Sequence, residues 1–110
     1  MPKKLLDNAS LPTLVSERLT VWGKCIHTQR LRQRIKAVEL CDRMGVSQAT
    51  LRRLERGDPG AGVGIYMTAM LILGVLDRVS PVVDPVFWLD TGSSRVRSRQ
   101  EGVTTNVDYF

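Results

Sequence analysis

The sequence has a single histidine and only two cysteines, too few for the clusters of nitrogen and sulfur ligands that a zinc site requires. The cysteines, Cys25 and Cys41, lie sixteen residues apart, and each falls in a helix-like pattern. We therefore interpret them as partly buried thiols of a reducing compartment. No nucleophile, base and orienting group form a recognisable catalytic set either. These absences predict a protein that is not an enzyme and that holds neither a metal nor a cofactor.

Long apolar runs are also absent. No stretch reaches the roughly 18 residues needed to cross a bilayer. The first residues, as far as Asp7, lack the apolar core of a secretion signal. We therefore expect a cytoplasmic protein. A chain of 110 residues, 43% of them hydrophobic, has room for one modest core and none for a second, catalytic domain.

Positive charge is concentrated in one stretch of the chain. Lysine and arginine total 16 against 11 for aspartate and glutamate, and the pI is near 9.8. From Lys24 to Arg56 there are nine basic and three acidic residues, whereas the rest of the chain has seven basic and eight acidic ones. A compact basic block on a small domain predicts a polyanionic partner that meets one face of the protein.

An amphipathic helix is predicted from about residue 14, after a flexible N-terminal arm over residues 1–13. Apolar residues recur there at steps of four, three and four, the spacing of a buried helical stripe, at Val15, Leu19, Trp22 and Ile26. We expect Thr13 or Ser16 to cap this helix, because a hydroxyl oxygen can accept a hydrogen bond from one of the first amides. The opposite, solvated face is predicted to carry Glu17, Lys24, His27, Arg30 and Arg34.

Two short helices joined by a glycine turn are predicted next. The first is indicated by the apolar residues Ala37, Val38, Leu40, Cys41 and Met44, and it stops at Gly45. Glycine adopts the left-handed conformation of a helix C-terminus without a steric penalty. Ser47 is then a favourable N-cap for a helix from Gln48 to about Arg56, with Leu51 and Leu54 turned inward. Two short helices around such a turn are typical of the DNA-binding helix-turn-helix.

The second half of the chain is predicted to supply a dimer interface. Residues 57–64 read as a loop, and residues 65–73 form a helix that is apolar nearly all round. Such a helix must be covered on more than one side, and in so short a chain a second copy is the expected cover. We therefore predict a homodimer whose interface includes Leu73, Val75, Leu76 and Val79. Residues 91–110 are predicted to be a flexible basic tail, with a short strand that crosses the dimer as the alternative.

The stretch from Trp22 to Gly57, WGKCIHTQRLRQRIKAVELCDRMGVSQATLRRLERG, resembles the Cro/repressor-like (XRE) helix-turn-helix family without a gap. The matching positions are Leu40, Cys41, Gly45, Val46, Ser47, Thr50, Leu51, Leu54, Glu55, Arg56 and Gly57. Residues 51–78 are similar to HipB-like regulators, which are DNA-binding partners of HipA-like kinase toxins. The chain departs from the family at Lys36-Ala37, where Thr or Ser followed by Gln is usual. The family's glutamine contact to a phosphate therefore does not transfer, and Lys36 is its expected substitute.

The predicted third helix carries the residues that we expect to contact DNA bases, namely Gln48, Ala49, Arg52 and Arg53. In the major groove an arginine can donate two hydrogen bonds to guanine, and a glutamine can make two to adenine. We expect Gln48 and Arg53 to read bases most directly, Ala49 to meet a thymine methyl group, and Arg52 to contact a base or a phosphate. Phosphate contacts are expected from Lys36, Ser47, Thr50 and Arg56.

The sequence thus predicts an all-α fold, a compact five-helix repressor-like helix-turn-helix domain over residues 14–90. The first functional hypothesis is a homodimeric regulator that binds a palindromic double-stranded DNA operator. The resemblance implies that it also binds a HipA-like kinase toxin, as the antitoxin of a toxin-antitoxin operon. The alternatives are a phage-type repressor without a toxin partner, and a protein-binding adaptor whose helix-turn-helix does not contact DNA.

Overall fold

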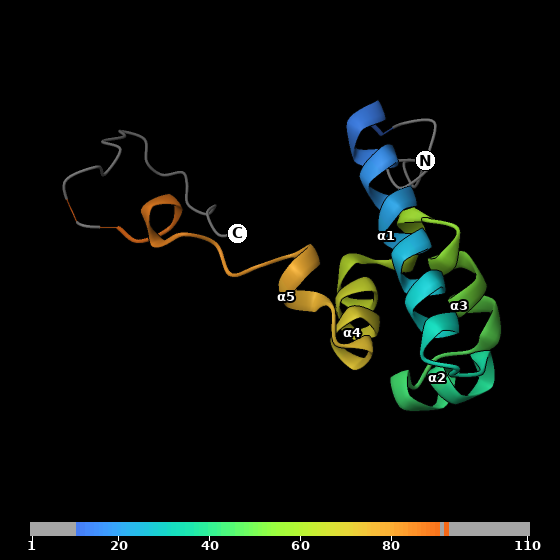
Figure 1. The fold of residues 1–110 in the computed structure, drawn as a ribbon. Coiled ribbons are helices and arrows are strands. Elements are labelled where there is room, and N and C mark those ends of the chain that lie inside the picture. Colours follow the sequence, from blue (N-terminus) through green and yellow to red (C-terminus); the bar gives the residue numbers. More distant parts are fainter. Residues whose placement is uncertain (1–10, 91, 93–110) are drawn as a thin grey trace.

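The computed structural model describes residues 11–90 and residue 92, and these residues are mostly helical, with no β-strand among them. The α-helices of this part of the chain (Figure 1) are α1 (Thr13–Arg32), α2 (Ala37–Met44), α3 (Gln48–Glu55), α4 (Val63–Leu73) and α5 (Leu76–Val79). Two short 3-10 helices, η3 (Pro59–Ala61) and η4 (Pro85–Phe87), lie in the connecting segments. The predicted all-α class is confirmed for these residues. Most of the predicted N-terminal arm, residues 1–10, and the predicted tail, apart from Gly92, lie outside the described residues.

The helices α2 and α3 begin and end where the sequence predicts. Gly45 follows α2 with a left-handed backbone, at a φ of 72°. The Ser47 hydroxyl oxygen caps α3 by accepting a hydrogen bond from the Thr50 amide at 3.1 Å. The predicted cap of α1 is wrong, because Pro12 takes the N-cap position and no side chain caps the helix. Thr13 already belongs to the first turn of α1.

The end of α1 also differs from the prediction. The helix ends at Arg32, and Arg34 adopts the left-handed conformation with a φ of 59°, so Arg34 does not lie on the solvated face of α1. Two hydrogen bonds close the helix: the Arg34 amide donates to the Leu31 carbonyl, and the Ile35 amide donates to the Arg30 carbonyl, both at 3.0 Å. This turn directs the chain so that Ile35 enters the core, where it is 9% exposed.

The core is built around α4, which contacts α1, α2 and α5. Tyr66, Ala69 and Met70 of α4 are fully buried. The other core residues are Ile26, Ile35, Leu40, Cys41, Leu51, Leu54 and Leu73, which confirms the inward orientation of Leu51 and Leu54. Leu19 and Trp22 are partly buried against this core. The predicted stripe of α1 fails at its first member: Val15 is 42% exposed, because the first turns of α1 project beyond α3 and α4 (Figure 1).

Residues 81–90 follow α5 without joining the core. Every one of them is exposed, and Figure 1 shows this segment running away from the packed helices. Its one turn of 3-10 helix is closed by the Asp84 side chain, which accepts a hydrogen bond from the Val86 amide at 3.0 Å. Among the described helices, none has both the length and the apolar character that spanning a membrane requires.

Candidate nucleic-acid interface

The outward side of α3 carries three of the predicted base-reading residues. Gln48, Ala49 and Arg52 are exposed, whereas Leu51 and Leu54 on the other side of the helix are 2% and 0% exposed. The two leucines are three residues apart, so they lie on one face and fix the orientation of the helix. The side chains of Gln48 and Arg52, four residues apart, therefore share the outer face.

Arg53 is the exception among these residues, because it has a partner within the protein. Its Nε donates a hydrogen bond to the Asp58 carboxylate at 3.1 Å, and its side chain is 43% exposed. The same carboxylate accepts a hydrogen bond from the Gly60 amide at 2.8 Å. The Gly60 amide and, to a smaller degree, the Arg53 guanidinium lower the pKa of Asp58 from its usual value. The pair with Asp58 engages Nε, so it holds the Arg53 side chain toward the loop after α3 and competes with any contact to DNA.

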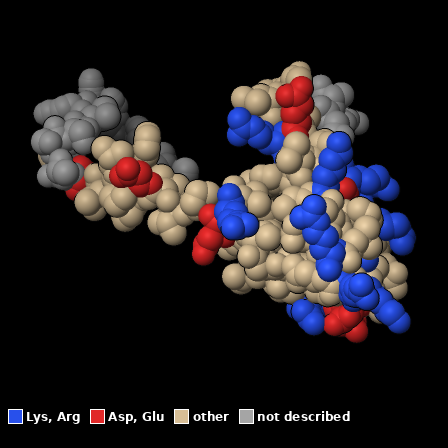
Figure 2. Space-filling model, viewed as in Figure 1, with Lys and Arg blue, Asp and Glu red and all other residues tan. Residues whose placement is uncertain are grey.

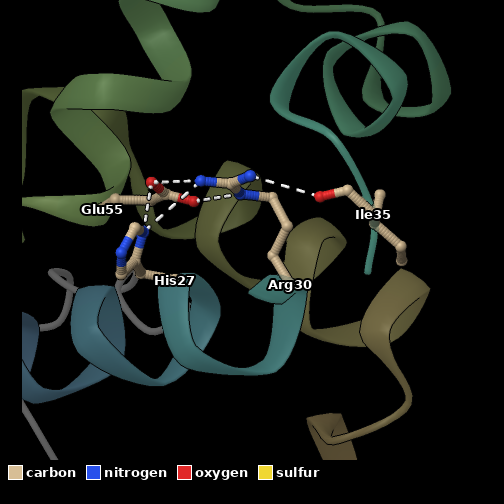
Figure 3. A network of polar contacts seen from close by, with 4 residues as sticks. All are labelled: His27, Arg30, Ile35 and Glu55. Atoms are coloured by element: carbon tan, nitrogen blue, oxygen red, sulfur yellow. Dashed lines mark hydrogen bonds and ion pairs between the residues drawn. The ribbon is translucent and has the colours of Figure 1, made fainter. Parts of the chain in front are cut away.

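Arg30 lies in a polar network that joins α1 to the last turn of α3 (Figure 3). Its Nε donates to one oxygen of Glu55 at 2.8 Å and a second guanidinium nitrogen donates to the other oxygen at 3.3 Å. A third bond runs to the Ile35 carbonyl at 3.2 Å, and His27 Nδ1 lies 2.9 Å from Glu55. The Arg30 and Glu55 side chains are 11% and 13% exposed.

The expectation that Arg30 belongs to a solvated face is therefore wrong. The end of α3 places the Glu55 carboxylate against α1 and replaces water as the partner of the guanidinium. Glu55 itself was indicated by the sequence only as a family-like position. The available signal was that Glu55 directly follows Leu54, which the sequence predicts to face inward, and that it is one of only three acidic residues between Lys24 and Arg56.

A basic hollow of about 410 Å³ opens at the start of α2, lined by Arg30, Leu31, Arg34, Ile35, Lys36 and Ala37. Lys36 holds the N-cap position of α2 and forms no capping hydrogen bond. Its ammonium can only donate, so the first amides of α2 have no side-chain cap at the positive end of the helix. Amide donors and lysine are thus placed where an anion such as a phosphate can bind.

The side chains of the other residues predicted to contact phosphate differ in whether they already form hydrogen bonds within the protein. The Ser47 hydroxyl accepts from the Thr50 amide and donates to Thr50 Oγ1, both at 3.1 Å, so it is used within the α3 cap. Thr50 accepts that bond and keeps its own hydroxyl proton for another acceptor. Arg56 is exposed at the C-terminal end of α3.

Charge is distributed unevenly over the molecule. Figure 2 shows lysine and arginine side chains over the part of the surface formed by α1 to α3, whereas the segment 81–90 shows only acidic and uncharged side chains. The described residues contain no group of three or more His, Cys, Asp or Glu side chains that could hold a metal ion. What this surface offers is hydrogen-bond donors and positive charge.

Of the four predicted dimer residues, one lies in the core and three keep some exposed surface. Leu73 is 3% exposed in the core of the single chain, and its side chain is therefore not available to a second copy. Val75, Leu76 and Val79 are partly buried against the same core and keep some exposed surface. On α4 itself, Leu71 is 64% exposed, so the apolar helix is not covered on all sides.

In comparisons with known proteins, no family model, no curated protein and no solved structure matches this chain.

Proposed function

We propose that this protein is a transcription regulator of the helix-turn-helix type that recognises double-stranded DNA through α3. The observation that carries the proposal is the pair α2 and α3, two eight-residue helices with Gly45, Val46 and Ser47 between them. Leu51 and Leu54 anchor α3 to the core, and its outer face is polar and basic. A helix that is anchored in this way can enter a major groove with its N-terminal half toward the bases.

Bases and phosphates are assigned to different residues in this proposal. Gln48, Ala49 and Arg52 meet base edges directly, and Arg53 joins them after it exchanges Asp58 for DNA. Lys36 and the uncapped amides of α2 bind a phosphate, which positions the protein without reading sequence. Thr50 and Arg56 add further backbone contacts, whereas Ser47 acts mainly by fixing the start of α3.

The regulator acts in the cytoplasm as a homodimer on a palindromic operator, since a two-fold protein matches a two-fold DNA site. The surface parts of Val75, Leu76 and Val79 supply apolar contacts for such a dimer. The resemblance to HipB-like regulators extends the proposal to a HipA-like kinase toxin as a partner. Co-expression with the product of the neighbouring gene, followed by co-purification, tests that part separately.

In vitro selection from a random duplex pool tests the DNA-binding proposal, since it finds the operator sequence in the same experiment. We expect the full-length protein to enrich one palindromic sequence. Gln48→Ala and Arg52→Ala should each lower affinity for that sequence by about 1–3 kcal/mol and leave random duplex nearly unaffected. Arg78→Ala, on α5 and outside the basic block, is the matched control. It should change neither the affinity for the selected sequence nor the affinity for random duplex.

Two results would contradict the proposal. If selection enriches no sequence, α2 and α3 do not recognise a DNA sequence, and the alternative of a protein-binding adaptor gains support. If Gln48→Ala and Arg52→Ala weaken the selected and the random duplex equally, α3 does not read sequence. Circular dichroism of each variant must first show that its helicity is that of the wild type.

A further inference from the structure

An apolar groove of about 490 Å³ lies between the first turns of α1 and the start of α4. Its walls include Leu14, Val15, Trp22 and Val63, and Arg18 contributes a positive charge. Leu14 and Val63 are each 59% exposed. The periodic stripe of α1 thus continues past the core into this groove, where its side chains remain in contact with water.

The same chain carries a second apolar segment, residues 81–90, that does not pack on the core. We call this segment the arm; it is distinct from the predicted N-terminal arm of residues 1–13. Val82, Val86, Phe87, Trp88 and Leu89 are between 59% and 87% exposed. The Trp88 indole donates a hydrogen bond to the Val83 carbonyl at 2.9 Å, so the arm has a local fold that orders its aromatic residues. The arm has two aspartates and neither lysine nor arginine.

We infer that the arm of one copy seats in the groove of a second copy, reciprocally across a dimer. Phe87 and Trp88 cover Leu14 and Val63 of the second copy, and an arm carboxylate lies near its Arg18. Charge complementarity supports this occupant, because the acidic arm meets a groove whose charged residue is basic. In Figure 1 the arm runs away from α1 of its own chain, a direction suited to a neighbour.

The area that two arms can bury fits a small, reversible dimer interface. Each buried aromatic side chain removes about 150–250 Å² from water. Phe87 and Trp88 are 79% and 60% exposed, so the four aromatic side chains of two arms can remove at most about 700 Å² from water. With the groove surface that they cover, the interface stays below about 1,200 Å², the size of a weak or transient interface. The burial also removes the largest group of exposed apolar side chains in the described part of the chain.

This inference rests on the dimer of the proposed function, but it does not depend on DNA, and it adds an interface that does not involve Val75, Leu76 or Val79. Sedimentation of the full-length protein without DNA tests it, with Leu14→Glu for the groove and the double variant Phe87→Ala/Trp88→Ala for the arm. We expect each to raise the dimer Kd by about tenfold or more, because one buries a charge and the other removes both aromatic anchors. Val21→Glu is the matched control: Val21 is also 59% exposed on α1 but does not line the groove.

Mixing the two variants distinguishes a neighbour's arm from the chain's own. A Leu14→Glu copy still has an arm and the arm variant still has a groove, so a fluorescently labelled mixture should form heterodimers with one arm seated. These should be tighter than either variant's own dimer. Trp88 emission should shift to the blue with increasing concentration in the wild type, and Trp88→Phe removes that part of the signal.

Each other result overturns the inference in a recognisable way. If the wild type is monomeric at micromolar concentration, both the proposed dimer and the arm interface are wrong. The DNA-binding proposal is then tested separately by the selection experiment. A dimer that tolerates both variants has another interface, and the groove then holds a different segment or a partner protein. A blue-shifted Trp88 that does not depend on concentration means that the arm folds onto its own chain.

Discussion

Gly23 of α1 and Gly57 after α3 meet backbone to backbone. A Cβ atom added at Gly23 would lie 2.7 Å from the Gly57 amide nitrogen, and one added at Gly57 would lie 2.6 Å from the Thr20 Cα. Both distances are shorter than any ordinary carbon contact, so no side chain fits at either place. Gly57 also has a φ of 81°, in the left-handed region that glycine favours. The pair sets how closely α1 packs against the end of α3.

Gly23→Ala should therefore destabilise the protein by about 1–3 kcal/mol or more, because rigid backbone on both sides of the contact must move apart. Gly64→Ala is the matched control, since Gly64 also lies in a helix and a Cβ there meets nothing within 4 Å. It should stabilise the protein by up to about 1 kcal/mol through helix propensity. Urea denaturation measures both; equal effects would show that the close approach is not maintained in solution.

The Arg30–Glu55 pair should contribute far more to folding than the exposed pair on α2. Glu55→Gln leaves the partly buried Arg30 guanidinium without its counter-charge, and we expect a loss of about 3 kcal/mol. Glu39→Gln breaks a pair whose side chains are 47% and 48% exposed, and it should cost less than about 0.5 kcal/mol. Thermal denaturation of both variants decides the matter, and similar losses would mean that Arg30 is solvated.

Tyr66 should make stability fall between pH 10 and about pH 12. Burial raises the pKa of Tyr66 to about 12, and its hydroxyl donates a hydrogen bond to the Asp58 carbonyl at 2.9 Å. The unfolded chain releases the phenolic proton near pH 10, but the folded chain holds it longer. The stabilising contribution is thus complete below pH 10 and is lost as the pH rises toward 12.

Tyr66→Phe gives the control for this pH dependence. It should lose about 0.5–1.5 kcal/mol at neutral pH, because the hydrogen bond is absent, and it should lack this part of the alkaline decline. The difference in unfolding free energy between wild type and variant, measured from pH 8 to 12, isolates the Tyr66 contribution from other groups. A difference that stays constant across this range would contradict the prediction.

Asp58→Asn should increase affinity for DNA. The change removes a negative charge near α3 and releases Arg53, while the asparagine oxygen can still accept the Gly60 hydrogen bond. Loss of the negative charge should tighten binding of selected and random duplex alike, and the released Arg53, as a base-reading residue, should add a further gain for the selected duplex. Anisotropy titrations at several salt concentrations should also give a steeper dependence of log K on log salt. Unchanged affinity would show that Arg53 does not reach DNA even when it is free.

Lys36→Ala should weaken selected and random duplex by the same factor, because a phosphate contact carries no sequence information. The slope of log K against log salt should become shallower by about one unit. Arg78→Ala, which removes an exposed positive charge from α5, is the control for net charge alone. If both variants change the slope equally, the hollow at the start of α2 is not a phosphate site.

Local features of the fold were predictable from the sequence. The turn at Gly45, the Ser47 cap and the inward side of Leu51 and Leu54 depend on neighbours within four residues. Backbone preferences and helical periodicity act over that range and are written in the chain directly. The outward position of Gln48 and Arg52 on α3 follows from the same periodicity.

Tertiary contacts decided the rest of the candidate site. Periodicity places Arg30 on a polar face, but only the packing of α1 on α3 brings Glu55 to it. Val15 has the spacing of a core residue, yet it is exposed because no helix covers the first turns of α1. Arg53 is turned toward Asp58 by the loop after α3. A sequence pattern determines the side of its own helix on which a residue lies. The residue that it contacts on another helix depends on where the two helices cross, and this is fixed only when the chain packs.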